Sequence, residues 1–222
     1  MTNNLKTLRP EAHYFGCFTD AFRKKVHILI YWGYTAARLR IKSDSIEETA
    51  ITGYIAEAII NRLRAFDCPR WCEDFSIMEN RPMQSEGREG KKRPQPDLVI
   101  EGNMRGRPEY IFEAKRLKNV GFGVDKYSGE DGLGCFINGK YAARYDEAAM
   151  LGYIQGDSPT YWQTKIQEKI KNNTDLNLIS FQPVAAIIND LPNEWRSSHR
   201  RKGIKRSISI FHIILDFRTG PF

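Results

Sequence analysis

Pro96-Asp97-Leu98-Val99-Ile100, followed closely by Tyr110-Ile111-Phe112-Glu113-Ala114-Lys115, is the stretch that decides the fold of this chain. Both runs are short, apolar for the most part and separated by a polar segment, which predicts two neighbouring β-strands joined by a turn. Side chains alternate between the faces of a strand, so Glu113 and Lys115 are expected on one face and Phe112 on the other. Two charged residues on one face of a core-like strand need a partner or an ion, because burying an unpaired charge is costly.

Asp97 adds a second carboxylate beside Glu113, and a divalent cation held between the two would remove their repulsion. Two structural interpretations stand beside this one. Asp97 after Pro96 is also typical of a turn without chemical role, and Glu113 with Lys115 can form a structural ion pair. The ion pair alone leaves Asp97 unexplained, so the three residues together favour a metal site.

Pro96-Asp97 with Glu113-Ala114-Lys115, on two predicted strands behind a helix that offers acidic residues, resembles the motif of the PD-(D/E)XK nuclease superfamily, the restriction-endonuclease-like phosphodiesterases. The resemblance covers roughly residues 45 to 155. It implies that Asp97 and Glu113 bind Mg²⁺, with Mn²⁺ as a substitute, and that Lys115 orients the attacking water. The chemistry is coherent, since hard divalent ions prefer carboxylate oxygens and acidify a bound water.

Glu48, in the predicted upstream helix, is the fourth candidate. The family often carries an acid on this helix, and Glu48 matches its place ahead of Ile51-Thr52. The segment Ser45-Ile46-Glu47-Glu48 is also typical of a capping box, in which the glutamate only bonds back to the helix start. Both interpretations stay open, with Glu47 as the alternative metal ligand.

A net charge of +7 and a pI of about 9.2 indicate a polyanionic partner, most simply nucleic acid, although charge alone does not separate nucleic acid from an anionic membrane surface. Basic runs flank the motif, and in a predicted helix basic and tyrosine residues alternate, which suits a nucleic-acid strand. A solvated surface is the alternative for such runs. The residues predicted to contact nucleic acid are Lys91, Lys92, Arg93, Lys140, Arg144, His199, Arg200 and Arg201. His212, inside an apolar run, is expected to be a core histidine.

The 222 residues predict one domain: a helical extension over 1–44, a core over 45–155, and C-terminal strands with a basic loop over 156–222. Helices are expected over 18–40, 46–63 and 140–151, and strands over 74–78, 184–188 and 208–215 besides the two motif strands. A glycine-rich loop over 121–139 is expected between the second motif strand and the helix over 140–151. This order predicts an α/β fold, a mixed sheet flanked by helices on both faces, and the resemblance implies a restriction-endonuclease-like core.

The four cysteines are expected to be free thiols in a reducing cytosol, since they lack zinc-site spacing; they are Cys17, Cys68, Cys72 and Cys135. The polar N-terminus does not resemble a signal peptide. The longest apolar run, 26–34, is far shorter than the roughly 20 residues that span a bilayer. The sequence therefore predicts a cytoplasmic protein without a membrane segment.

These features together predict a Mg²⁺-dependent nuclease, most simply a DNA endonuclease, with a role as a host-defence effector as an extension. The alternative is a catalytically inactive nucleic-acid-binding module of the same fold, and the intact Asp97, Glu113 and Lys115 count against it. DNA is favoured over RNA as the partner. Because no target-recognition module is evident, control by self-association or by a sensor or regulatory protein is expected.

Overall fold

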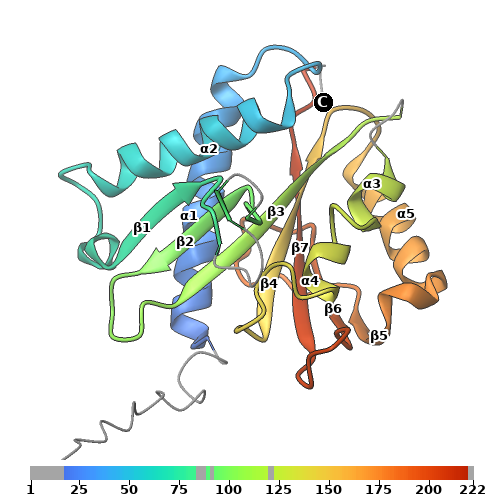
Figure 1. Ribbon diagram of the computed structural model, residues 1–222. Helices are drawn as coiled ribbons and strands as arrows, with labels where there is room; N and C mark the ends of the chain where they lie inside the picture. Colours follow the sequence, from blue (N-terminus) through green and yellow to red (C-terminus); the bar gives the residue numbers. More distant parts are fainter. Residues whose placement is uncertain (1–17, 84–88, 91–92, 120–122, 220–222) are drawn as a thin grey trace, which may run out of the picture.

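The computed structural model describes residues 18–83, 89–90, 93–119 and 123–219. In this part of the chain seven strands form one mixed sheet in the order β1-β2-β3-β4-β7-β6-β5 (Figure 1). The central pairs β3–β4 and β4–β7 are parallel, and the outer pairs are antiparallel. The strands are β1 (Phe75–Glu79), β2 (Leu98–Gly102), β3 (Glu109–Leu117), β4 (Glu147–Ile154), β5 (Leu178–Gln182), β6 (Glu194–His199) and β7 (Ile208–Asp216).

Helices cover both faces of the sheet, as the sequence predicts for an α/β fold. Figure 1 shows α1 behind the sheet, α2 crossing above β1 to β3, and the remaining helices in front of the other half. The α-helices are α1 (Asp20–Arg40), α2 (Glu48–Leu63), α3 (Val124–Ser128), α4 (Gly134–Ile137) and α5 (Pro159–Asn172). Short 3-10 turns lie at η2 (Arg70–Asp74) and η4 (Thr174–Leu176).

Local sequence explains the position of α1. The Thr19 hydroxyl accepts a hydrogen bond from the Phe22 amide at 3.1 Å, so it caps the helix. The buried side of α1 packs on α2, and the two helices approach closely at Gly33. A Cβ atom there would lie 2.8 Å from side-chain atoms of Ile55 and Ile59, so only glycine allows this approach.

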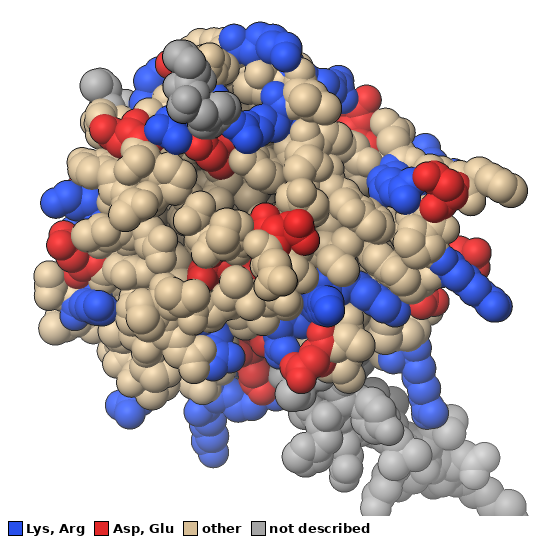
Figure 2. All heavy atoms as spheres, turned by 180° about the vertical axis from the view of Figure 1, so that it is seen from behind, with Lys and Arg blue, Asp and Glu red and all other residues tan. Residues whose placement is uncertain are grey.

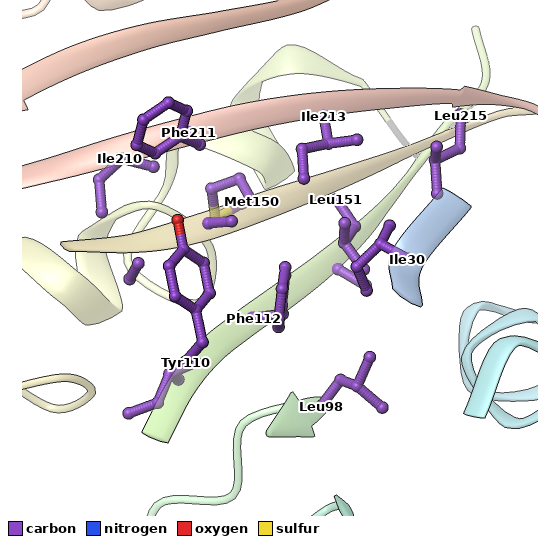
Figure 3. Packing of buried hydrophobic residues seen from close by; sticks show 14 of the residues in the cluster. Ile30, Leu98, Tyr110, Phe112, Met150, Leu151, Ile210, Phe211, Ile213 and Leu215 are labelled. Carbon is purple, nitrogen blue, oxygen red and sulfur yellow. The ribbon is translucent and has the colours of Figure 1, made fainter. Parts of the chain in front are cut away.

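The core between α1 and the sheet is built from aligned rows of apolar side chains (Figure 3). Phe112 of β3 lies beside Ala149 of β4, which lies beside Phe211 of β7, and Ile30 of α1 covers the same region. All eight residues of β4 are buried, because the strand has neighbours on both sides and helices on both faces.

The burial of β4 explains why the predicted helix over 140–151 is wrong. Ala148, Ala149, Met150 and Leu151 favour a helix in isolation, but a strand inside a parallel sheet is also apolar almost throughout. The predicted loop over 121–139 is corrected as well, since α3 and α4 lie within it.

Two further element predictions are wrong in the C-terminal third. Residues 184–188 are not a strand; the strands there are β5 and β6, whose polar residues hide the pattern. Helix α5 was not predicted. Its signal is present, because the Ser158 hydroxyl accepts from the Tyr161 amide at 3.1 Å and Pro159 occupies the first helical position.

The expectation of free thiols is wrong for one pair, because Cys68 and Cys72 form a disulfide. The bend between α2 and β1 brings their Cα atoms to 6.4 Å, within reach of a disulfide. Cys135 is a free, buried thiol, and Cys17 lies outside the described residues. Among the described helices, none has the length and apolar character needed to cross a membrane.

Candidate active site

The candidate site forms where strand β3 extends past its neighbour β2. The last pair of the β2–β3 ladder is Leu98 with Phe112, and β3 continues to Leu117. Two backbone amides beyond the ladder donate to carboxylates instead of to a strand. The Ala114 amide donates to Asp97 Oδ2 at 2.7 Å, and the Arg116 amide donates to Glu48 Oε2 at 2.7 Å. The free edge of β3 therefore fixes the position of two acids from distant parts of the chain.

Lys115 links the acids to one another. Its ammonium donates to Glu113 Oε1 at 2.7 Å, to Glu48 Oε1 at 3.3 Å and to the Ala114 carbonyl at 2.7 Å. Asp97 continues the β2–β3 register opposite Glu113, so their side chains share one face of the sheet. The structure thus brings together all four predicted catalytic residues. We call Glu48, Asp97, Glu113 and Lys115 the acid cluster.

The position of Glu48 excludes one of its two interpretations. Helix α2 begins at Glu48, its N-cap is Glu47, and Glu47 makes no side-chain capping bond. The capping-box interpretation is therefore wrong, because both oxygens of Glu48 are bonded to β3. Glu47 points elsewhere: its side chain is 71% exposed and pairs with Arg116 at 2.8 Å. Glu48, not Glu47, belongs to the acid cluster.

The cluster holds more negative charge than its one ammonium offsets. Burial, and then the charge of Asp97, raise the pKa of Glu113 to about 8 despite the nearby Lys115. Burial also raises the pKa of Asp97, against the hydrogen bond from Ala114 and the charge of Lys115. Burial alone would lower the pKa of Lys115, but the carboxylates of Glu113 and Glu48 outweigh it and raise that pKa. Asp97 and Glu113 are thus destabilised as anions unless another cation joins them.

One oxygen of the cluster lacks a partner. Glu113 Oε2 is buried, and within the described residues it accepts no hydrogen bond. An ammonium has three N–H donors, and those of Lys115 go to Glu113 Oε1, Glu48 Oε1 and the Ala114 carbonyl. A buried carboxylate oxygen without a donor is costly. Because its pKa is raised to about 8, Glu113 can share a proton with the Asp97 carboxylate, and a cation between the two acids would take the place of that proton. Asp97, Glu113 and Glu48 are the residues that can hold a metal here, although no three His, Cys, Asp or Glu side chains in the described chain form a ready-made metal-binding group.

Tyr141 supports the segment that carries Asp97. Its hydroxyl donates to the Gln95 carbonyl at 3.0 Å, two residues before Asp97, and its ring is buried. Burial, and next the charge of Glu113, raise the pKa of this tyrosine well above its ordinary value. Sequence reasoning placed Tyr141 in a helix beside nucleic acid and missed this supporting contact, because the contact depends on the turn before β4.

The basic residues predicted to bind nucleic acid divide into accessible and buried ones. Lys140 and Arg144 line a groove of about 1010 Å³ at one end of the sheet. Arg200 is exposed and Arg93 is half-buried, while Lys91 and Lys92 lie outside the described residues. On the face seen from behind the view of Figure 1, charges of both signs are scattered and do not form one basic patch (Figure 2).

His199 and Arg201 are corrections. Both are buried, because His199 ends strand β6 inside the sheet and Arg201 follows directly. The His199 ring bonds the Leu176 carbonyl at 2.7 Å and Ser197 at 2.7 Å. Arg201 donates to the Ala142 carbonyl at 2.9 Å. Neither side chain reaches a surface phosphate, so the predicted basic loop is in part internal structure.

No family model, curated protein or solved structure matches this chain. The acid cluster and the groove are therefore interpreted from their own contacts and chemistry.

Proposed function

We propose that this protein is a metal-dependent nuclease of the restriction-endonuclease-like type, which hydrolyses phosphodiester bonds of nucleic acid and favours DNA. One observation carries the proposal: the acid cluster converges from α2, the start of β2 and the middle of β3, yet leaves Glu113 Oε2 without a partner. A purely structural cluster is expected to satisfy its buried oxygens. A cation-binding cluster keeps one for the ion.

Asp97 and Glu113 would hold Mg²⁺ or Mn²⁺, and Glu48 would complete the carboxylate set. When bound, the ion acidifies a coordinated water and offsets the charge that develops on the phosphate. Asp97 and Glu48 each keep one oxygen bonded to the backbone of β3, which fixes their orientation. Lys115, held between Glu113 and Glu48, would donate to the attacking water and stabilise the transition-state charge.

The alternative is a nucleic-acid-binding module of the same fold without catalysis. It explains the accessible Lys140 and Arg144 but not the acid cluster, because repelling carboxylates near the substrate oppose phosphate binding. The surplus of acid therefore favours the enzyme over the binding module.

A cleavage assay tests the proposal. The purified protein is incubated with plasmid, linear duplex, single-stranded DNA or RNA, in Mg²⁺, Mn²⁺ or EDTA. We expect cleavage that needs the metal and is absent from Asp97→Asn. Glu57→Gln is the matched control, because Glu57 lies on the exposed side of α2 and pairs with Arg40. Cleavage of equal rate by Asp97→Asn and the native protein would refute the assignment, as would no cleavage of any of the four substrates.

A further inference from the structure

A second pair of acids lies on the same sheet face as Asp97 and Glu113. Glu101 and Glu109 are direct neighbours across the β2–β3 ladder. Glu109 precedes Glu113 by four residues of one strand, so the two side chains share a face and lie about 13 Å apart. The hairpin thus presents two acidic pairs with the apolar pair Val99 and Ile111 between them.

Two arginines cover this second pair. Arg81 Nη1 lies 3.4 Å from Glu101 Oε2 and also contacts Glu109 Oε1, while Arg107 Nη2 contacts Glu101 Oε1. The carboxylate of Glu101 is almost fully buried, whereas the side chains of Arg81 and Arg107 are 34% and 71% exposed. A guanidinium has five N–H donors in a planar fork, and these ion pairs use one nitrogen of each arginine. The acids therefore orient the two forks and leave their other donors accessible.

The forks point to a space large enough for a ligand. Arg81 and Arg107 line the groove of about 1010 Å³, together with Lys140, Arg144 and Tyr145 on the segment before β4. Glu130 and Asp131 line it as well, so its basic side chains are balanced by acidic ones. This balance disfavours a track for phosphates alone, whose affinity comes from net positive charge. A groove with balanced charges suits a planar, uncharged ligand group that offers two adjacent hydrogen-bond acceptors.

The backbone at Arg107 supports a role for its side chain. Arg107 has a φ of 44°, in the left-handed region that favours glycine. A non-glycine residue is disfavoured there, and such positions cluster at functional sites. An arginine at this position of the β2–β3 turn places its guanidinium on Glu101 at the rim of the groove.

Resting on the proposed nuclease function, we propose that Arg81 and Arg107 are specificity-determining residues that read a guanine of the bound nucleic acid. Guanine presents O6 and N7 as adjacent acceptors, and bidentate arginine is their commonest partner. Because Glu101 and Glu109 hold the forks, little side-chain entropy is lost on binding. The nuclease would therefore prefer guanine at one position, displaced from the cleaved bond by the roughly 13 Å between Glu109 and Glu113.

The test measures binding without cleavage. In EDTA, the native protein selects oligonucleotides from randomised single- and double-stranded pools, and fluorescence anisotropy then compares the selected sequence with single-base variants at several salt concentrations. We expect a preference for guanine at one position of about tenfold or more. Arg107→Lys keeps the charge and the contact with Glu101 but loses the fork, so it should abolish the preference and leave the salt slope unchanged.

The controls separate this proposal from a phosphate contact and from the nuclease assignment. Arg105→Ala, exposed in the same turn but not among the described residues that line the groove, should keep the preference. The proposal is overturned if the native protein shows no base preference, if it binds no oligonucleotide, or if Arg107→Lys keeps the preference. A guanine preference without metal-dependent cleavage in the separate assay would support the groove and refute the nuclease. Cleavage without a base preference would support the nuclease assignment and refute guanine recognition in the groove.

Discussion

Two polar clusters share one face of the sheet and differ in how completely their hydrogen bonds are satisfied. The acid cluster lies on β2, β3 and α2. The other, which we call the histidine chain, lies between β6, β7 and α3 and consists of Tyr127, Ser197, His199 and His212. The four side chains of the histidine chain are buried, so both clusters pay the cost of removing polar groups from water.

Every donor in the histidine chain meets an acceptor. The Leu176 carbonyl can only accept, so His199 Nδ1 donates to it at 2.7 Å and the neutral His199 Nε2 accepts from Ser197 at 2.7 Å. Ser197 in turn accepts from His212 Nε2 at 2.8 Å, and His212 Nδ1 accepts from the Tyr127 hydroxyl at 2.9 Å. Burial lowers the pKa of both histidines, which keeps both rings neutral, as this directional chain requires.

The acid cluster has the opposite balance, with more acceptors than donors. Its single ammonium and two backbone amides face three carboxylates, and Glu113 Oε2 is left over. A satisfied buried network stiffens and specifies the core, whereas a partly satisfied one is costly unless a ligand completes it. The comparison teaches that buried polarity alone does not single out a candidate site. Unpartnered polar atoms also occur elsewhere in the core, such as Trp195 Nε1, and what distinguishes the acid cluster is an unpartnered oxygen among three carboxylates.

The largest expected effect is on cleavage, from removing the charge of Glu113. Glu113→Gln keeps the size of the side chain but removes a metal ligand, and we expect cleavage to fall by more than about 100-fold, since changes outside the ligand shell alone cost 10–100-fold. Above about pH 8, where Glu113 is charged in the absence of metal, the melting temperature should stay the same or rise, because a repelled buried charge is lost. Steady-state cleavage and thermal unfolding of the same preparation measure both. Native-like cleavage by this variant would place Glu113 outside the site.

The histidine chain should make stability depend on pH. Below about pH 6.5 the unfolded chain binds a proton at His199 and at His212, whereas the folded protein, in which burial lowers both pKa values, binds these protons only at lower pH. The free energy of unfolding should therefore fall as the pH decreases through about 6.5, with a contribution of up to about 2.7 kcal/mol per pH unit from the two sites.

Urea unfolding at several pH values measures this slope. His199→Gln removes one of the two titrating groups, so its slope in the same pH range should be smaller by about one proton, which corresponds to about 1.4 kcal/mol per pH unit. An identical slope for the variant and the native protein would show that His199 does not contribute.

Ser197 offers a complementary test of the same chain. Ser197→Ala leaves a buried donor on His212 and a buried acceptor on His199 without partners, and each such loss costs about 1–3 kcal/mol. We expect the variant to lose about 2 kcal/mol or more of unfolding free energy while its cleavage rate is unchanged. Ser198→Ala is the matched control. The Ser198 hydroxyl bonds the Ser209 hydroxyl across the β6–β7 ladder at 3.0 Å, and this contact is only partly buried. Equal stability losses in the two variants would contradict the comparison.

The smallest expected effect separates Glu48 from its neighbour. Glu48→Gln retains an oxygen for the Arg116 amide but removes one negative charge from the cluster. Cleavage should fall by about tenfold at limiting Mg²⁺ and recover in part at higher concentrations, with little change in melting temperature. Glu47→Gln serves as the control and should be silent, since its exposed side chain pairs with Arg116. The same Mg²⁺ dependence in both variants would remove Glu48 from the metal shell.

The sequence predicted the parts of the site that depend on local pattern. Strand alternation placed Glu113 and Lys115 on one face. The pairing of the two motif strands placed Asp97, just before β2, beside them. The start of α1 is likewise a local feature, because the Thr19 cap involves only residues 19 to 22.

The rest depends on how elements meet. Glu48 bonds to β3 because β3 extends beyond the end of β2 and leaves the Arg116 amide free of a strand partner. No local sequence pattern reveals this difference in strand length. His199 and Arg201 resemble surface cations in sequence but are enclosed between strands. Arg81 and Arg107 were missed because their importance comes from Glu101 and Glu109, which lie far from Arg81 in sequence and are adjacent only in the folded hairpin.

The unpaired edge of β3 has a consequence for solubility. An open row of backbone amides is a template on which another chain can add a strand, and proteins commonly block such edges with charged side chains. Asp97 and Glu48 occupy the two amides that an added strand would use. The same carboxylates that we assign to the metal therefore also block the exposed edge of β3 against the addition of another strand. Metal binding and protection from aggregation both require an acidic side chain at Asp97 and at Glu48.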